Sequence, residues 1–263
     1  MAIYTTMDGP RVSGIALLDP GAFINGALQQ PFARYVAADA GASSWTGRGA
    51  GGALAITGAG GAPSLAQATC FQNDTGVKFN GGAGSRHYRS AGTTDGQVTT
   101  EDLLFELVFR HETAAKNCRL FQKSEAGLKG WTIYQDAGSN KIYGYFNDGA
   151  NTVLPTAPAA MALTRYYHLV LFMDRSEAST NGCKIIQNGT AGTGVDPSAL
   201  LTITNTGHMT IGAAEDGSSP ADNMVVYCAA WAKAGWFAGG AGGAAEILTW
   251  AQNRYARLKG IGG

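Results

Sequence analysis

The sequence predicts an all-β protein, a sandwich of two antiparallel sheets with an irregular arm before it and a short helix after it. From Thr99 onward, short apolar and aromatic segments follow one another, and Gly, Asn and Asp separate them at the spacing of strands and turns. The pattern lacks the alternation of strands with long helices that βαβ units require. A length of 263 residues suits a single sandwich domain of this class.

The strands are predicted from alternation of apolar side chains. The segment 102–110 places Leu103, Phe105, Leu107 and Phe109 on one face, as a half-buried strand does. The segment 165–174 is almost continuously apolar, which predicts a strand covered on both faces. Further strands are predicted in segments 130–135, 141–146, 183–187, 201–204, 208–212 and 224–231, and the pair Asn188-Gly189 predicts a tight turn.

One helix is predicted, close to the C-terminus. Within the segment 244–258, Ile247, Ala251, Tyr255 and Leu258 recur at helical spacing. We expect this helix to cover one end of the sandwich. The aromatic residues just before it, Trp231, Trp236 and Phe237, are expected to form a plug beneath it.

Composition argues against several classes of protein. The 19 basic and 19 acidic residues balance, so we expect neither a nucleic-acid partner nor a membrane partner. The first residues show no secretory signal, which indicates a protein that starts in a cytoplasm or a sequence that is already mature. The cysteines (Cys70, Cys118, Cys183 and Cys228) are widely spaced, and we expect free, buried thiols rather than a zinc site.

The order of several short segments resembles a known superfamily. Gly76-Val-Lys-Phe-Asn-Gly-Gly, the strand 103–109, Tyr166–Asp174, Lys184-Ile-Ile-Gln-Asn-Gly and Met209-Thr-Ile-Gly follow one another as in the concanavalin A-like, laminin-G-like jelly-roll proteins. The likeness covers about Tyr35 to Lys259. It implies a jelly-roll sandwich, and the Gly-rich, neutral composition resembles that of bacteriophage particle components of this kind.

The first residues lie outside the resemblance and are predicted to form a separate arm. We divide the chain into an arm, 1–34, and a jelly-roll domain, 35–263. The arm has scattered apolar residues but little core of its own, and it would attach the domain to other virion proteins or to copies of itself. Its candidate contact residues are Tyr4, Ile15, Leu17, Leu18, Phe23 and Ile24.

Catalytic chemistry finds little support in the sequence. Hydrolases that resemble this fold carry acids at every second position of one strand, whereas here Leu104 separates Asp102 from Glu106. We expect these two acids to face solvent. His168, inside an apolar strand, is expected to be a structural histidine. The sequence therefore predicts a protein that is not an enzyme and needs no cofactor.

Aromatic residues are the best candidates for a ligand site. If Ile142 and Phe146 face the core, Tyr143 and Tyr145 face outward. On the strand before, Trp131 and Tyr134 point to opposite faces, so only one of them can join the pair, and we choose Trp131 as the candidate. An ordinary cross-strand packing of these rings is the alternative. The resemblance also makes calcium possible, with Asp148 and Asp174 as weak candidates beside a turn-forming role.

Two functions follow as hypotheses. The first is a non-enzymatic component of a bacteriophage virion surface, either capsid decoration or tail protein, assembled in the host cytoplasm and anchored through its arm. The alternative is a lectin-like module, with calcium as an optional aid, that binds host-surface glycans and acts outside the cell. The two can coexist.

Overall fold

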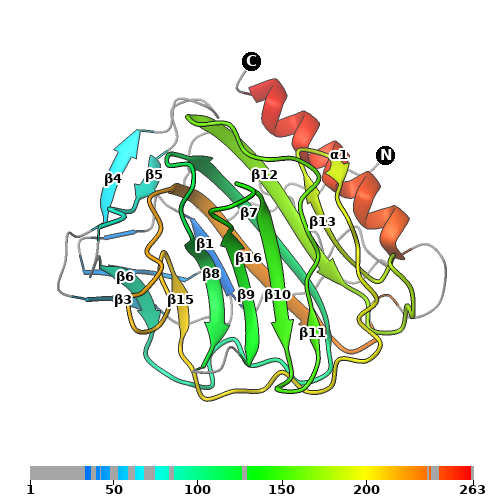
Figure 1. The fold of residues 1–263 in the computed structure, drawn as a ribbon. Helices are drawn as coiled ribbons and strands as arrows, with labels where there is room; N and C mark the ends of the chain where they lie inside the picture. Colours follow the sequence, from blue (N-terminus) through cyan, green and yellow to red (C-terminus); the bar gives the residue numbers. More distant parts are fainter. Residues whose placement is uncertain are drawn as a thin grey trace, which may run out of the picture.

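The computed structural model describes residues 33–36, 40–41, 43–47, 53–58, 63–67, 75–82, 86–125, 129–235, 237 and 243–261. These residues form two antiparallel sheets stacked face to face, and α1 (Gly243–Ile261) lies against the outside of one of them (Figure 1). The predicted all-β sandwich with a C-terminal helix is confirmed.

Sheet A consists of the strands that α1 covers together with the strands beside them. In spatial order it contains β14 (Thr190–Ala191), β13 (Cys183–Gln187), β12 (Arg165–Met173), β7 (Asp102–His111), β16 (Met224–Lys233), β5 (Thr75–Lys78) and β4 (Ser64–Gln67), and β1 (Ala33–Val36) also pairs with β16. The predicted turn at Asn188-Gly189 joins β13 to β14, and both residues have the positive φ that such a tight turn requires.

Sheet B is the second layer and faces the viewer in Figure 1. In spatial order it contains β11 (Thr152–Val153), β10 (Ile142–Asn147), β9 (Gly130–Gln135), β8 (Cys118–Ser124), β15 (Met209–Ile211), β6 (His87–Ser90), β3 (Leu54–Thr57) and β2 (Ser44–Trp45). The segment 201–204, predicted as a strand, has no regular secondary structure.

The main core lies between the two sheets. Leu103, Phe105, Leu107 and Phe109 all point into it from β7, as their alternation predicted. The ring of Phe105 packs against Trp131 of β9, with 4.9 Å between ring centroids, and Trp131 packs in turn against Phe121 of β8 at the same distance. These aromatic contacts join the two sheets.

A second apolar cluster lies on the outer side of sheet A and corrects the expected position of the helix. Helix α1 covers this outer face rather than one end of the sandwich, because the outward side chains of β7 and β12 are themselves apolar. The cluster contains Leu104, Val108, Val170, Phe172, Trp231, Phe237, Ile247, Ala251 and Leu258. Strand β12 therefore has both faces covered, as predicted, and Trp231 and Phe237 form the expected plug; Trp236 lies outside the described residues.

The expectation that Asp102 and Glu106 face solvent is wrong. They lie on the same outward side of β7 as Leu104, and α1 and the segment before it cover that side. Glu106 is fully buried and accepts hydrogen bonds from Arg254 of α1 at 2.8 Å and from His168 of β12 at 3.0 Å. Asp102 accepts hydrogen bonds from the backbone N–H groups of Arg175 and Phe237. His168 is thus structural, as predicted.

The remaining predictions on the fold concern cysteines and chain ends. Cys118, Cys183 and Cys228 are buried free thiols, as expected, whereas Cys70 lies outside the described residues. Sheet A already begins at Ala33, two residues before the predicted start of the domain. In the described part of the chain, no helix has both the length and the apolar character needed to span a bilayer.

Candidate functional site

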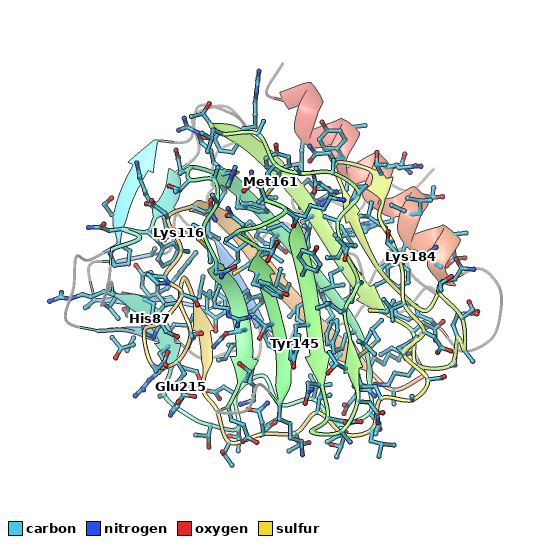
Figure 2. All side chains as sticks on the ribbon, in the orientation of Figure 1. His87, Lys116, Tyr145, Met161, Lys184 and Glu215 are labelled. Carbon is cyan, nitrogen blue, oxygen red and sulfur yellow. The ribbon has the colours of Figure 1, made fainter. Side chains whose placement is uncertain are left out.

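The outward side of sheet B carries the tyrosines singled out in the sequence. Strand β10 alternates as predicted: Ile142 and Phe146 are buried in the core, while Tyr143 and Tyr145 are partly exposed on the other side. Figure 2 shows Tyr145 near the middle of the sheet face turned toward the viewer. Gly144 lies between them on the core side, where a Cβ atom would come within 2.8 Å of Leu171 of sheet A. A glycine therefore lets β10 approach the opposite sheet closely.

The third aromatic residue on this face is Tyr134, which corrects the choice of Trp131. Trp131 is 1% exposed and packs between Phe105 and Phe121, so it belongs to the core. Tyr134, three residues further along β9, points outward and stands directly opposite Tyr143. Their rings are stacked, with 5.6 Å between centroids and 22° between planes. We call Tyr134, Tyr143 and Tyr145 the tyrosine platform.

The turn between β9 and β10 sets the register that brings these rings together. The carboxylate of Asp136 accepts hydrogen bonds from the backbone N–H of Ser139 at 2.7 Å and from its hydroxyl at 2.8 Å. Asn140 follows with a φ of 55°, a conformation that Asn tolerates better than most residues. This short loop places Tyr143 opposite Tyr134 and Tyr145 opposite Thr132.

Polar side chains from the neighbouring strand complete the face, and sequence reasoning missed them. The ladder aligns Arg119 of β8 with Tyr134 and aligns Gln122 with Thr132. The guanidinium carbon of Arg119 lies 4.8 Å from the centroid of the Tyr134 ring, within the range of a cation–π contact. A β-bulge between Arg119 and Phe121 produces this alignment, and simple alternation does not predict it.

The phenol groups of the platform are anchored at its edges. The hydroxyl of Tyr145 accepts a hydrogen bond from the side-chain amide of Asn147 at 3.2 Å, and the hydroxyls of Tyr143 and Ser139 are 3.4 Å apart. Partial burial raises the pKa of Tyr134, so its phenol stays protonated at neutral pH. The platform therefore presents aromatic rings with polar rims, a surface suited to ligands that have both apolar and hydroxyl-bearing parts.

The carboxylates of the two weak calcium candidates, Asp148 and Asp174, accept hydrogen bonds from loop residues. Asp148 accepts backbone hydrogen bonds from Ala150, Asn151 and Leu201. Burial opposes ionisation of Asp148, but these hydrogen bonds lower its pKa overall. Asp174 accepts hydrogen bonds from the backbone N–H and the hydroxyl of Ser176. Among the described residues, no three His, Cys, Asp or Glu side chains gather as a metal site would require.

The predicted contact residues of the arm (Tyr4, Ile15, Leu17, Leu18, Phe23 and Ile24) lie outside the described residues. The arm and the domain boundary therefore stay predictions. The outward face of sheet B is the candidate site that the described residues support.

Comparisons with known proteins bear on the fold. No family model matches the chain, and no curated protein matches it. Among solved structures, it is similar to the binding domain of Paraclostridial Mosquitocidal Protein 1, with a TM-score of 0.60 and 9% identity over 86% of this chain and 51% of that one. It is also similar to the Botulinum Neurotoxin serotype G binding domain, with a TM-score of 0.59 and 9% identity over 86% of this chain and 50% of that one.

A third similar structure is a domain that the match covers over nearly the whole length of that domain. It is domain 4 of AbnA, a GH43 extracellular arabinanase from Geobacillus stearothermophilus, solved in complex with arabinotriose. The TM-score is 0.53 and the identity 11%, over 86% of this chain and 98% of that domain. The chain shares the sandwich fold of these domains. It spans about half the length of the two toxin binding domains, and identities this low establish the fold alone.

Proposed function

We propose that this chain is a non-catalytic carbohydrate-binding domain and that the tyrosine platform is its contact surface. The observation that carries the proposal is the outward placement of Tyr134 and Tyr143, whose rings stack on each other, with Tyr145 in the next row of the same sheet face. Rigid aromatic rings with polar rims offer contact area at low cost in conformational entropy. A sugar ring has an apolar face and hydroxyl edges, and these match the rings and the polar groups around them.

The known complexes of similar structures support this choice. Domain 4 of AbnA was solved with arabinotriose, and the binding domain of Botulinum Neurotoxin DC was solved with SialylT. The neighbours also include an enzyme, Trypanosoma rangeli sialidase, of which this chain spans 33%. The two strand acids here argue against hydrolysis at β7, because Glu106 is fully buried under α1 and paired with Arg254.

The virion role predicted from the sequence has no comparable support. Neither the two toxin binding domains nor domain 4 of AbnA is a phage protein, and residues 1–32 of the arm that would provide attachment lie outside the described residues. Attachment to a particle, self-association and an extracellular location stay predictions. A glycan-binding domain is compatible with each of them.

Calcium assistance also stays a prediction. It would require Asp148 or Asp174 to exchange loop hydrogen bonds for a metal ion. Sugar binding measured with and without a chelator tests it, and unchanged affinity would remove calcium from the proposal.

A glycan array followed by calorimetry on the full chain tests the proposed function. We expect Tyr143→Ala and Tyr145→Ala each to weaken binding of the selected sugar at least about fivefold, the equivalent of roughly 1 kcal/mol of lost ring contact. Tyr166→Ala is the matched control, because Tyr166 is a partly exposed tyrosine on sheet A. The proposal fails if no sugar binds, or if the platform variants bind as well as the control.

A further inference from the structure

The guanidinium group of Arg119 has different contacts from those of Arg254, Arg110 and Arg175. Arg254 hydrogen-bonds to Glu106, Arg110 pairs with Glu112 at 3.4 Å, and Arg175 donates to several backbone carbonyls, including Leu200 O at 2.8 Å. Among the described residues, no carboxylate or carbonyl accepts a hydrogen bond from the Arg119 guanidinium. The guanidinium instead lies over the face of the Tyr134 ring.

The electrostatic surroundings leave Arg119 charged but weakly compensated. Burial lowers the pKa of Arg119, yet an arginine remains protonated at any physiological pH. Asp216 acts on it electrostatically, but its carboxylate accepts a hydrogen bond from the backbone N–H of Ser218 at 2.8 Å and makes no ion pair with Arg119. The N–H groups of the guanidinium are therefore available to an acceptor from outside the chain.

The adjacent row of the same face is closed. Gln122 and Thr132 stand opposite each other on β8 and β9, beside Tyr145. Thr132 is fully buried and Gln122 is 2% exposed. Arg119 and the tyrosines of the platform are partly exposed, so they are the groups of this face that a ligand can contact.

We infer that the face around Arg119 selects acidic sugars, with the guanidinium holding a sugar carboxylate while the tyrosine platform holds the ring. This inference rests on the proposed function and specifies its ligand class. A planar guanidinium donates two parallel hydrogen bonds to a carboxylate, a geometry that neutral sugar hydroxyls match less well.

Calorimetry with matched pairs of sugars tests the inference on the full chain. The probes are sialyllactose against lactose, and trigalacturonic acid against its carboxyl-reduced, neutral counterpart. We expect at least one acidic sugar to bind about tenfold more tightly than its neutral partner, and this preference to shrink as salt rises. The two pairs distinguish a sialic acid from a uronic acid as the source of the carboxylate.

Variants then assign the preference to one residue. Arg119→Met should remove the preference for the acidic partner while leaving neutral-sugar binding in place, and Arg119→Lys should keep part of it. Arg110→Met is the matched control, because Arg110 also lies over a tyrosine ring, that of Tyr166 on sheet A. Thermal unfolding of each variant verifies that it is folded.

The outcomes separate this inference from the proposed function. Equal binding of acidic and neutral sugars, or a preference that survives Arg119→Met, overturns the inference but leaves a sugar-binding platform. Absence of binding to any sugar on the array overturns both. Loss of the preference in Arg119→Met but not in Arg110→Met supports the inference.

Discussion

The outer faces of the two sheets are built from the same alternating strand geometry but end in opposite situations. The outward side of sheet A carries Leu104, Val108, Val170 and Phe172, and α1 seals them from water. The outward side of sheet B carries tyrosines, an arginine, a glutamine and threonines, and α1 packs on the other sheet. The outward side of sheet A forms a second core, whereas the outward side of sheet B leaves aromatic and polar side chains partly exposed.

The polar residues of the two faces show the same difference. On sheet A, Glu106 meets Arg254 and His168 in a closed cluster, so its charge is compensated within the fold. Burial alone would raise the pKa of Glu106, but the Arg254 charge and the His168 hydrogen bond lower it. On sheet B, Arg119 lies against a tyrosine ring rather than a carboxylate.

The largest predicted effect separates the inner and the outward side of sheet B. Trp131→Ala should cost about 3–5 kcal/mol of unfolding free energy, because it leaves a cavity among Phe105 and Phe121. Tyr145→Ala, on the outward face of the adjacent strand, should cost about 1 kcal/mol or less. Urea denaturation measures both, and equal losses would mean that the platform is a stability element.

Breaking the closed cluster on sheet A should be almost as costly. Arg254→Met leaves the Glu106 carboxylate buried with His168 as its remaining described hydrogen-bond donor, and we expect a loss of about 3–5 kcal/mol. The double variant Glu106→Leu with Arg254→Met should recover much of this stability, because it removes the buried charge as well. Denaturation curves of the three proteins test this. A single variant within about 1 kcal/mol of the unmodified chain would contradict the account of the cluster.

Much of the fold could be predicted from the sequence, because it rests on local patterns. Alternation placed Phe105 and Phe109 in the core and sent Tyr143 and Tyr145 outward. The prediction failed where a distant segment decides the environment. Glu106 lies on the side of β7 that faces away from the main core, where an acid is expected to face solvent. Arg254, 148 positions later in the chain, covers it. The apolar Leu104 and Val108 on the same side were a signal of this cover.

The site was harder to predict than the fold. Alternation showed that only one of Trp131 and Tyr134 could join the tyrosines, but residue type does not say which. The register set by the Asp136 turn decides it, and that register is a property of the paired strands. Arg119 reaches the face through a β-bulge, which shifts alternation by one residue and is not visible in a single sequence.

Between the two sheets, a buried lysine makes the stability of the fold depend on pH. Lys123 of β8 is fully buried and donates to the carbonyl of Thr93 at 2.6 Å; burial lowers its pKa to about 8. The folded state therefore binds fewer protons than the unfolded state between about pH 8 and pH 10.5, so this group adds stability as pH rises through that window.

We expect the free energy of unfolding of the unmodified chain to rise by roughly 2–3 kcal/mol relative to that of Lys123→Met between about pH 7 and pH 10. Denaturation of both proteins across that range measures the difference, and the common titration of other groups cancels. A constant difference would show that the Lys123 pKa is not lowered by the fold.

Locating a bound sugar tests most directly the claim that the outward side of sheet B binds the ligand and that of sheet A does not. Amide and side-chain NMR shifts of the full chain, titrated with the tightest-binding oligosaccharide from the array, report where contact occurs. We predict that the shifts concentrate on β8, β9 and β10 around Arg119, Tyr134 and Tyr145, and leave α1 unchanged. Shifts centred on α1 and sheet A, or on loops away from the platform, would contradict the assignment of recognition to the open face.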